Sequence, residues 1–108
     1  MLDLDKYINN SIQIKLFGAE YDVLEPTIKM TMEVDRIESD LTKENLHKKR
    51  LETGVLLLSH NKQGRIFTEE ELSELPFEAL TRVLAEITVL RLKADADPNS
   101  ASQSQAAK

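Results

Sequence analysis

The chain has 108 residues, of which 41% are hydrophobic and 5% aromatic, so it can build one modest core. The formal net charge of −5 argues against a surface that binds nucleic acid, and the absence of cysteine excludes disulfides and thiolate chemistry. No apolar run approaches the roughly 20 residues of a membrane span, and the first residues mix leucine with aspartate, unlike a secretory signal. We therefore expect a single soluble domain in the cytoplasm.

A β-hairpin is predicted near the N-terminus, after a helical turn over residues 3–9 that Asp3 could cap. Residues 11–25 form two alternating segments around Gly18 and Ala19, and glycine in the first position of a two-residue loop suits a type II′ turn. An isolated hairpin is marginally stable in water. The helix that follows it is its natural cover.

The predicted turn fixes which side chains of the hairpin lie opposite each other. It pairs Leu16 with Tyr21 on one face and Lys15 with Asp22 on the other. One face of the hairpin is then apolar, and the other contains a cross-strand ion pair.

Two middle helices are expected after the hairpin. The first follows Thr27 as its N-cap and carries apolar residues at helical spacing, namely Met30, Val34, Ile37 and Leu41. The second spans residues 43–60 after the cap Thr42, with a solvated first half and an apolar second half. Gly54 in this helix predicts the close approach of another backbone.

The last element is predicted over Thr68 to Leu92. Thr68 and Glu71 have the spacing of a capping box, and Ile66 and Phe67 before them could pack on Leu72 as a hydrophobic staple. Pro76 then separates a short acidic turn from a long helix. The core face of the long helix is predicted to consist of Phe77, Leu80, Val83, Leu84, Ile87 and Leu90.

The fold class predicted from these elements is α+β, with an N-terminal β-hairpin packed on a mainly helical body of three to four helices. Residues 1–93 form the domain. Residues 94–108 are small and polar, and we expect them to be a disordered tail.

A candidate partner-binding strip lies on nearly the opposite side of the last helix from its core face. It consists of Ala85, Val89 and Leu92 with charged neighbours. Either this strip binds a partner or the rest of the domain covers it.

No catalytic, cofactor or metal site is predicted. His47 and His60 lie 13 positions apart, which is not a metal-ligand spacing. Acidic residues such as Glu69 in a first helical turn fit the helix dipole, and the basic run from His47 to Arg50 is expected to be a solvated helix face.

Two segments carry a resemblance to a known family. YDVLEPTIKMTMEVDRIE covers residues 21–38, and TEEELSELPFEAL covers residues 68–80. With the hairpin, the two middle helices and the final apolar helix, residues 2–92 resemble the small tail assembly chaperones of long-tailed bacteriophages of Gram-positive hosts.

This resemblance implies a protein without catalytic activity in the host cell cytoplasm. It would bind the tape-measure protein, keep that long coil soluble, and promote polymerisation of the tail tube, with the major tail tube protein as a possible second partner. It would be absent from the finished virion. In many such phages a ribosomal frameshift yields a longer product, and the predicted tail is where an extension could attach.

Two other functions stay open at this stage. One is a small DNA-binding regulator or antitoxin that places the helix of Lys48 to Arg50 on DNA. The other is a structural tail component that remains in the virion. The apolar strip could also mediate self-association, whereas no membrane or cofactor is expected.

Overall fold

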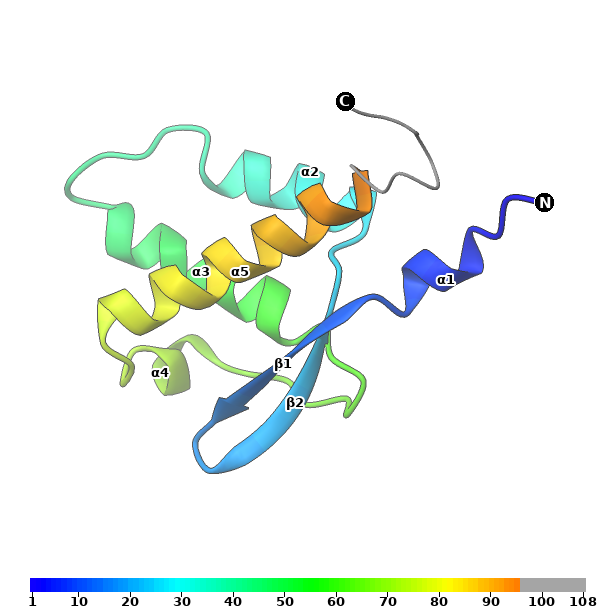
Figure 1. Ribbon diagram of the computed structural model, residues 1–108. Helices are drawn as coiled ribbons and strands as arrows, with labels where there is room; N and C mark the ends of the chain where they lie inside the picture. The colour runs from blue at the N-terminus through cyan, green and yellow to red at the C-terminus, as the bar shows by residue number, and fades with distance from the viewer. Residues whose placement is uncertain (96–108) are drawn as a thin grey trace.

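The predicted hairpin and helices are both present in the computed structural model (Figure 1). The structure describes the backbone of residues 1–95 and the side-chain surroundings of residues 1–88. The elements are α1 (Asp5–Ile8), β1 (Ser11–Leu16), β2 (Ala19–Leu24), α2 (Ile28–Ile37), α3 (Leu46–Leu58), α4 (Glu69–Leu72) and α5 (Phe77–Asp95). This order confirms the α+β class, in which α2, α3 and α5 form the helical body and α4 adds one turn.

Helix α1 extends away from this body (Figure 1), and none of its residues is buried. Its N-cap is Leu4, so the prediction of Asp3 as the cap was wrong. The Asp3 carboxylate instead accepts a hydrogen bond of 3.0 Å from the backbone N–H of Asp5.

The hairpin turn lies one residue earlier than predicted, at Phe17 and Gly18. Their φ angles of 52° and 84° define a type I′ turn, whose twist matches that of the two strands. Leu16 therefore pairs with Ala19 and not with Tyr21.

The observed turn gives the hairpin a different register from the predicted one, but every side chain stays on its predicted face. Lys15 pairs with Glu20, so the predicted ion pair with Asp22 is wrong, while Ile12 pairs with Val23. Each pairing has moved by two residues on β2, and a shift of two leaves every side chain on its original face.

Helix α5 lies against β1, whereas α2 packs mainly on α3, so the expected cover of the hairpin was wrong. Pro26 and the extended backbone of Thr27 redirect the chain before α2 begins. The Thr27 cap is confirmed by its hydrogen bond of 3.1 Å from the Met30 N–H. Leu41 lies beyond the end of α2 and is exposed.

Helix α3 begins at Leu46, three residues later than predicted. The Thr42 N–H donates to the Asn45 side chain at 2.8 Å, and the Asn45 N–H donates to the Thr42 hydroxyl at 3.2 Å. This reciprocal pair closes a separate turn, so Thr42 does not cap α3. Gly54 of α3 faces two leucine side chains and not a backbone, since an added Cβ would lie 3.0 Å from Leu80 Cδ1 and 3.2 Å from Leu72 Cδ1.

The main core joins the hairpin, α3, α4 and α5. It contains Leu16, Val23, Leu57, Leu58, Phe67, Leu72, Leu80, Leu84 and Ile87. Three of the predicted core residues of α5 are thus confirmed, and Val83 is half-buried. Phe77 is 42% exposed and lies edge-on to the His47 ring, with centroids 4.7 Å apart.

The segment between α3 and α5 forms as predicted. Thr68 and Glu71 make both hydrogen bonds of the capping box, and the Pro76 carbonyl accepts a bond of 3.0 Å from the Ala79 N–H at the start of α5. Of the residues expected to form the staple, Phe67 and Leu72 are buried in the core, whereas Ile66 is 65% exposed.

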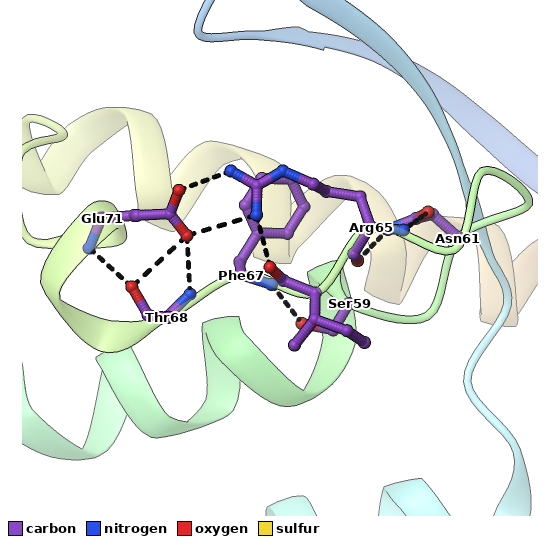
Figure 2. A network of polar contacts seen from close by, with 7 residues as sticks. Ser59, Asn61, Arg65, Phe67, Thr68 and Glu71 are labelled. Carbon is purple, nitrogen blue, oxygen red and sulfur yellow. Dashed lines mark hydrogen bonds and ion pairs between the residues drawn. The ribbon is translucent and has the colours of Figure 1, made fainter.

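A polar network holds the connector between α3 and α4 (Figure 2). Asn61 is 8% exposed; its amide donates to the Leu58 and Arg65 carbonyls at 2.8 Å each, and its oxygen accepts from the Arg65 N–H at 2.9 Å. The Arg65 guanidinium pairs with Glu71 and lies 4.6 Å from the centre of the Phe67 ring. This network fixes the connector where it runs beside β2.

Helix α5 continues to Asp95, two residues past the predicted domain end at residue 93. Leu90 lies beyond the residues whose side chains are described. The remainder of the predicted tail, residues 96–108, lies outside the described residues.

Candidate protein-binding groove

An open apolar groove lies between β1 and α5. It has a volume of about 480 Å³, and residues 12–16 of β1 and residues between 79 and 86 of α5 line it. The lining residues are Ile12, Gln13, Ile14, Lys15, Leu16, Leu58, Leu75, Ala79, Arg82, Val83 and Glu86. We call this feature the β1–α5 groove.

The walls of the β1–α5 groove are apolar because each element presents its inner face there. Ile12, Ile14 and Leu16 alternate along β1 and therefore share one face of the hairpin. Leu16 and Leu58 belong to the buried core, while Ile12 and Ile14 are only half-buried. The groove thus continues the core outward to the surface.

The rim of the β1–α5 groove is charged. On α5, Arg82 Nε donates to Glu86 Oε2 at 3.1 Å, one helical turn apart. Lys15 on β1 forms no ion pair with any residue that the structure describes. The rim therefore has one cation in excess of its carboxylates, although the chain as a whole carries −5.

The outer edge of β2 is already occupied by the connector after α3. The Asp22 carbonyl accepts from the Lys62 N–H at 3.0 Å, the Asp22 N–H donates to the Gln63 side chain at 2.9 Å, and the Leu24 N–H donates to the His60 carbonyl at 2.9 Å. Asn61 also forms an isolated bridge with Val23. A further strand cannot add on this side of the hairpin.

The outer edge of β1, by contrast, has free hydrogen-bonding groups. The N–H and carbonyl of Asp22 point away from β1, so Asp22 and its partner Gln13 exchange no backbone hydrogen bonds. The N–H and carbonyl of Gln13 therefore point away from β2. Every second pair of an antiparallel ladder is of this kind, so the N–H and carbonyl of Lys15 also point away from β2. Neither residue's backbone bonds to a described group outside the hairpin, and both residues line the β1–α5 groove.

The predicted site residues lie elsewhere on α5. Ala85 is exposed, as expected for the proposed strip, but it does not line the β1–α5 groove. Val89 and Leu92 lie on the helical backbone of α5, and their side chains are outside the described part of the chain. Binding by the strip of Ala85, Val89 and Leu92 stays a prediction.

Sequence reasoning missed the groove because it treated Val83 as ordinary core and assigned α2 as the cover of the hairpin. A signal was present in the alternation of Ile12, Ile14 and Leu16, which makes an apolar face as long as the strand itself. A single helix crossing that face covers only part of it, and the part left over is the groove.

Lys48 and Arg50 of the basic run on α3 lie beside carboxylates. Lys48 Nζ lies 2.5 Å from Glu69 Oε1 and 4.0 Å from Glu52 Oε2, and the hydrogen bond to Glu69 is the main cause that raises the Lys48 pKa. Arg50 Nε lies 3.7 Å from Glu38 Oε2, which also accepts a bond of 2.7 Å from the Thr53 hydroxyl. These carboxylates reduce the positive electrostatic potential around Lys48 and Arg50.

Comparison with known proteins gave no match to a family model, to a curated protein or to a solved structure. Among the side chains that the structure describes, residues 1–88, no group of three or more acidic or histidine residues is arranged to hold a metal ion. The helices in the described part of the chain are all too short or too polar to cross a bilayer.

Proposed function

We propose that this protein is a tail assembly chaperone that binds the tape-measure protein in the host cytoplasm and promotes polymerisation of the tail tube. The observation that carries a protein-binding function is the β1–α5 groove, an open apolar surface joined to the core of a small acidic domain. The identity of the client rests on the resemblance of residues 2–92 to the chaperone family.

The groove suits a client that is insoluble on its own. Its half-buried Ile12, Ile14 and Val83 can receive apolar side chains of the client, while the net charge of −5 on the chain favours solubility of the complex. An apolar groove on a negatively charged domain supports a protein that binds a hydrophobic chain and carries out no chemical step.

The regulator and antitoxin alternative depends on a basic helix face. Lys48 and Arg50 are engaged by Glu69 and Glu38, so two of the cations that would contact phosphate already have carboxylate partners. This pairing favours the protein-binding proposal. Salt-dependent retention of the protein on nonspecific duplex DNA would support the alternative instead.

Co-expression with a fragment of the tape-measure protein tests the proposal. The fragment is expected to become soluble and to co-purify with the chaperone. A fragment that stays insoluble and does not co-purify would contradict the proposal. Mass spectrometry of purified virions is expected to find no copy of this chain, whereas its presence would indicate a structural tail component.

Two tryptophan substitutions on α5 distinguish the groove from the strip predicted on its other side. Ala79→Trp places a large ring in the β1–α5 groove, and Ala85→Trp places the same ring on the exposed face outside it. Both positions are exposed, so both variants are expected to fold. Capture of the fragment should fall with Ala79→Trp and persist with Ala85→Trp; the reverse result, or a loss with Val89→Asp in a folded protein, would assign binding to the strip of Ala85, Val89 and Leu92.

A further inference from the structure

We propose that the β1–α5 groove binds its partner as an extended segment that adds to the free edge of β1 as a third strand. This inference rests on the proposed function for the identity of the natural client, but not for the mode of binding. The partner segment would have apolar side chains at alternating positions and a carboxylate beside Lys15.

The backbone of β1 favours an extended partner. The outward N–H and carbonyl groups of Gln13 and Lys15 form a short row at the groove, and an extended chain satisfies such a row by continuing the sheet. A helix lying in the groove has no free backbone groups to pair with them. The edge therefore favours an extended occupant over a helical one.

The position of α5 determines which side chains the partner strand must carry. Helix α5 stands across the groove from β1 and contributes Ala79, Arg82 and Val83 to the opposite wall. A strand added to β1 would point every second side chain toward the apolar floor of Ile12 and Ile14 and the others toward the exposed face of the hairpin. Alternating apolar residues are thus required of the partner.

The positive charge of Lys15 favours an acidic residue in the partner strand. Lys15 and Gln13 lie on the exposed face of the hairpin, and the Lys15 ammonium forms no ion pair among the described residues, although Glu20 lies opposite it on β2. A strand residue directly opposite Lys15 would lie on that same face, where an aspartate or glutamate is the favourable neighbour. Arg82 is already paired with Glu86, so the preference concentrates at Lys15.

The other edge of the sheet makes the assignment specific. The connector residues His60, Lys62 and Gln63 occupy the edge of β2 with three hydrogen bonds, so a third strand can add only at β1. The chain thus closes one edge of its hairpin and leaves open the edge that borders an apolar groove.

Gln13→Pro tests the backbone contact from the side of the protein. Proline removes the outward N–H of residue 13 while the bonds of β1 to β2, made by the neighbouring residues, remain. Gln13→Thr is the matched control, because it changes the same side chain and keeps the N–H. The probe is a fluorescein-labelled heptapeptide of alternating leucine and aspartate with blocked ends, and its binding is measured by fluorescence anisotropy.

The peptide is expected to bind the wild type and the Gln13→Thr variant equally, and the Gln13→Pro variant about tenfold more weakly. A peptide of the same composition with its leucines in one block should bind at least about tenfold more weakly than the alternating peptide. Circular dichroism and thermal unfolding verify that the proline variant is folded. Equal binding of both peptides, or no effect of proline in a folded variant, would overturn strand addition.

N-methylation of the peptide repeats the test with an unaltered protein, so it decides the matter even if Gln13→Pro fails to fold. One edge of an added strand faces β1 and the other faces away, and alternate residues contribute their N–H groups to each edge. Methylation of all aspartate nitrogens should abolish binding in an antiparallel complex, and methylation of all leucine nitrogens should do so in a parallel one. Equal effects of both methylations would contradict strand addition.

Three further outcomes separate this inference from its rivals. Light scattering that shows a dimer converted to a monomer by Gln13→Pro, without any peptide binding, would make a second copy the occupant and overturn a partner strand. Peptide binding without capture of the tape-measure fragment would reject the client and retain strand addition. Capture of the fragment that is insensitive to Gln13→Pro would retain the chaperone and reject strand addition.

Discussion

Phe17 occupies a backbone position that favours glycine or asparagine. Its φ of 52° lies in the left-handed region, which costs an L-residue with a bulky side chain roughly 1 kcal/mol. The side chain is 53% exposed at the tip of the hairpin, so burial offsets little of this cost. Phenylalanine at position 17 therefore makes the turn less stable than glycine or asparagine would.

Phe17→Asn is expected to raise the free energy of unfolding by about 1 kcal/mol, because asparagine followed by glycine is the preferred type I′ turn. Urea denaturation measures the change. Phe17→Ala is the control, since it removes the ring and keeps a residue that disfavours positive φ. Equal stability of the asparagine and alanine variants would show that the backbone conformation is not the source of the effect.

Glu71 is the residue whose charge is most closely tied to the fold. The hydrogen bond from Arg65 is the largest cause that lowers its pKa below the ordinary value of 4.5, and the Thr68 N–H is the next. A carboxylate whose pKa is lowered by folding stabilises the native state above the unfolded pKa. That stabilisation is lost as the pH falls through the native pKa.

Glu71→Gln keeps a side-chain oxygen that can accept the capping hydrogen bond, but it removes the negative charge. The wild type is expected to be more stable than this variant above pH 4.5, the ordinary pKa, and the difference should shrink as the pH falls below that value. Unfolding free energies across the acid range provide the measurement. Glu70→Gln, at a carboxylate without an ion pair among the described residues, should show no such dependence.

At the scale of elements, the packing of α3 on α4 and α5 depends on Gly54. Leu80 and Leu72 are 4% and 1% exposed, so neither side chain has much room to yield to an added Cβ. Overpacking of this kind costs about 1–3 kcal/mol, and the gain in helix propensity from glycine to alanine is about 1 kcal/mol. The cost of overpacking is therefore expected to exceed the gain in helix propensity.

Gly54→Ala is therefore expected to lower the free energy of unfolding by about 1 kcal/mol, although alanine is the better helix former. In a Leu80→Ala background the same substitution should be neutral or stabilising, because the closest contact is gone. Stabilisation of the otherwise unaltered protein by alanine would mean that the two leucines repack freely.

Local signals predicted most elements of this fold. The caps at Thr27 and Thr68 and the break at Pro76 each depend on a few neighbouring residues, so a pattern in the sequence suffices. The turn at Phe17 was missed because positive φ at phenylalanine is unusual. The reciprocal bonds of Thr42 with Asn45, which delay α3, were missed because either residue can serve as a cap.

At the scale of the whole molecule, the groove could not be predicted from any one element. It depends on α5, not α2, lying beside β1 and on the connector of Asn61 pairing with β2, and both are contacts between segments far apart in the sequence. Of the predicted binding strip, Ala85 is the one residue whose side chain lies in the described part of the structure, where it is exposed. The apolar face of the hairpin was predictable, whereas the part left uncovered was not.

The N-terminal arm, residues 1–9, contributes little to the folded body. Leu2, Leu4 and Ile8 are each more than 60% exposed, whereas Asn10 is fixed by hydrogen bonds to Glu25. Deletion of residues 1–9 is expected to change the free energy of unfolding by no more than about 0.5 kcal/mol. Deletion of residues 1–10 should cost more, because both bonds to Glu25 are lost; equal losses would show that the arm itself packs on the body. Urea denaturation of the two truncated proteins gives the comparison.

The position of α5 also determines when the protein can fold during its synthesis. Leu80, Leu84 and Ile87 complete the core around Leu58 and Phe67, yet they are among the last described residues to be translated. A nascent chain that ends at Pro76 lacks α5, so Leu58 and Phe67 stay exposed to solvent. The core can close only after α5 has emerged from the ribosome.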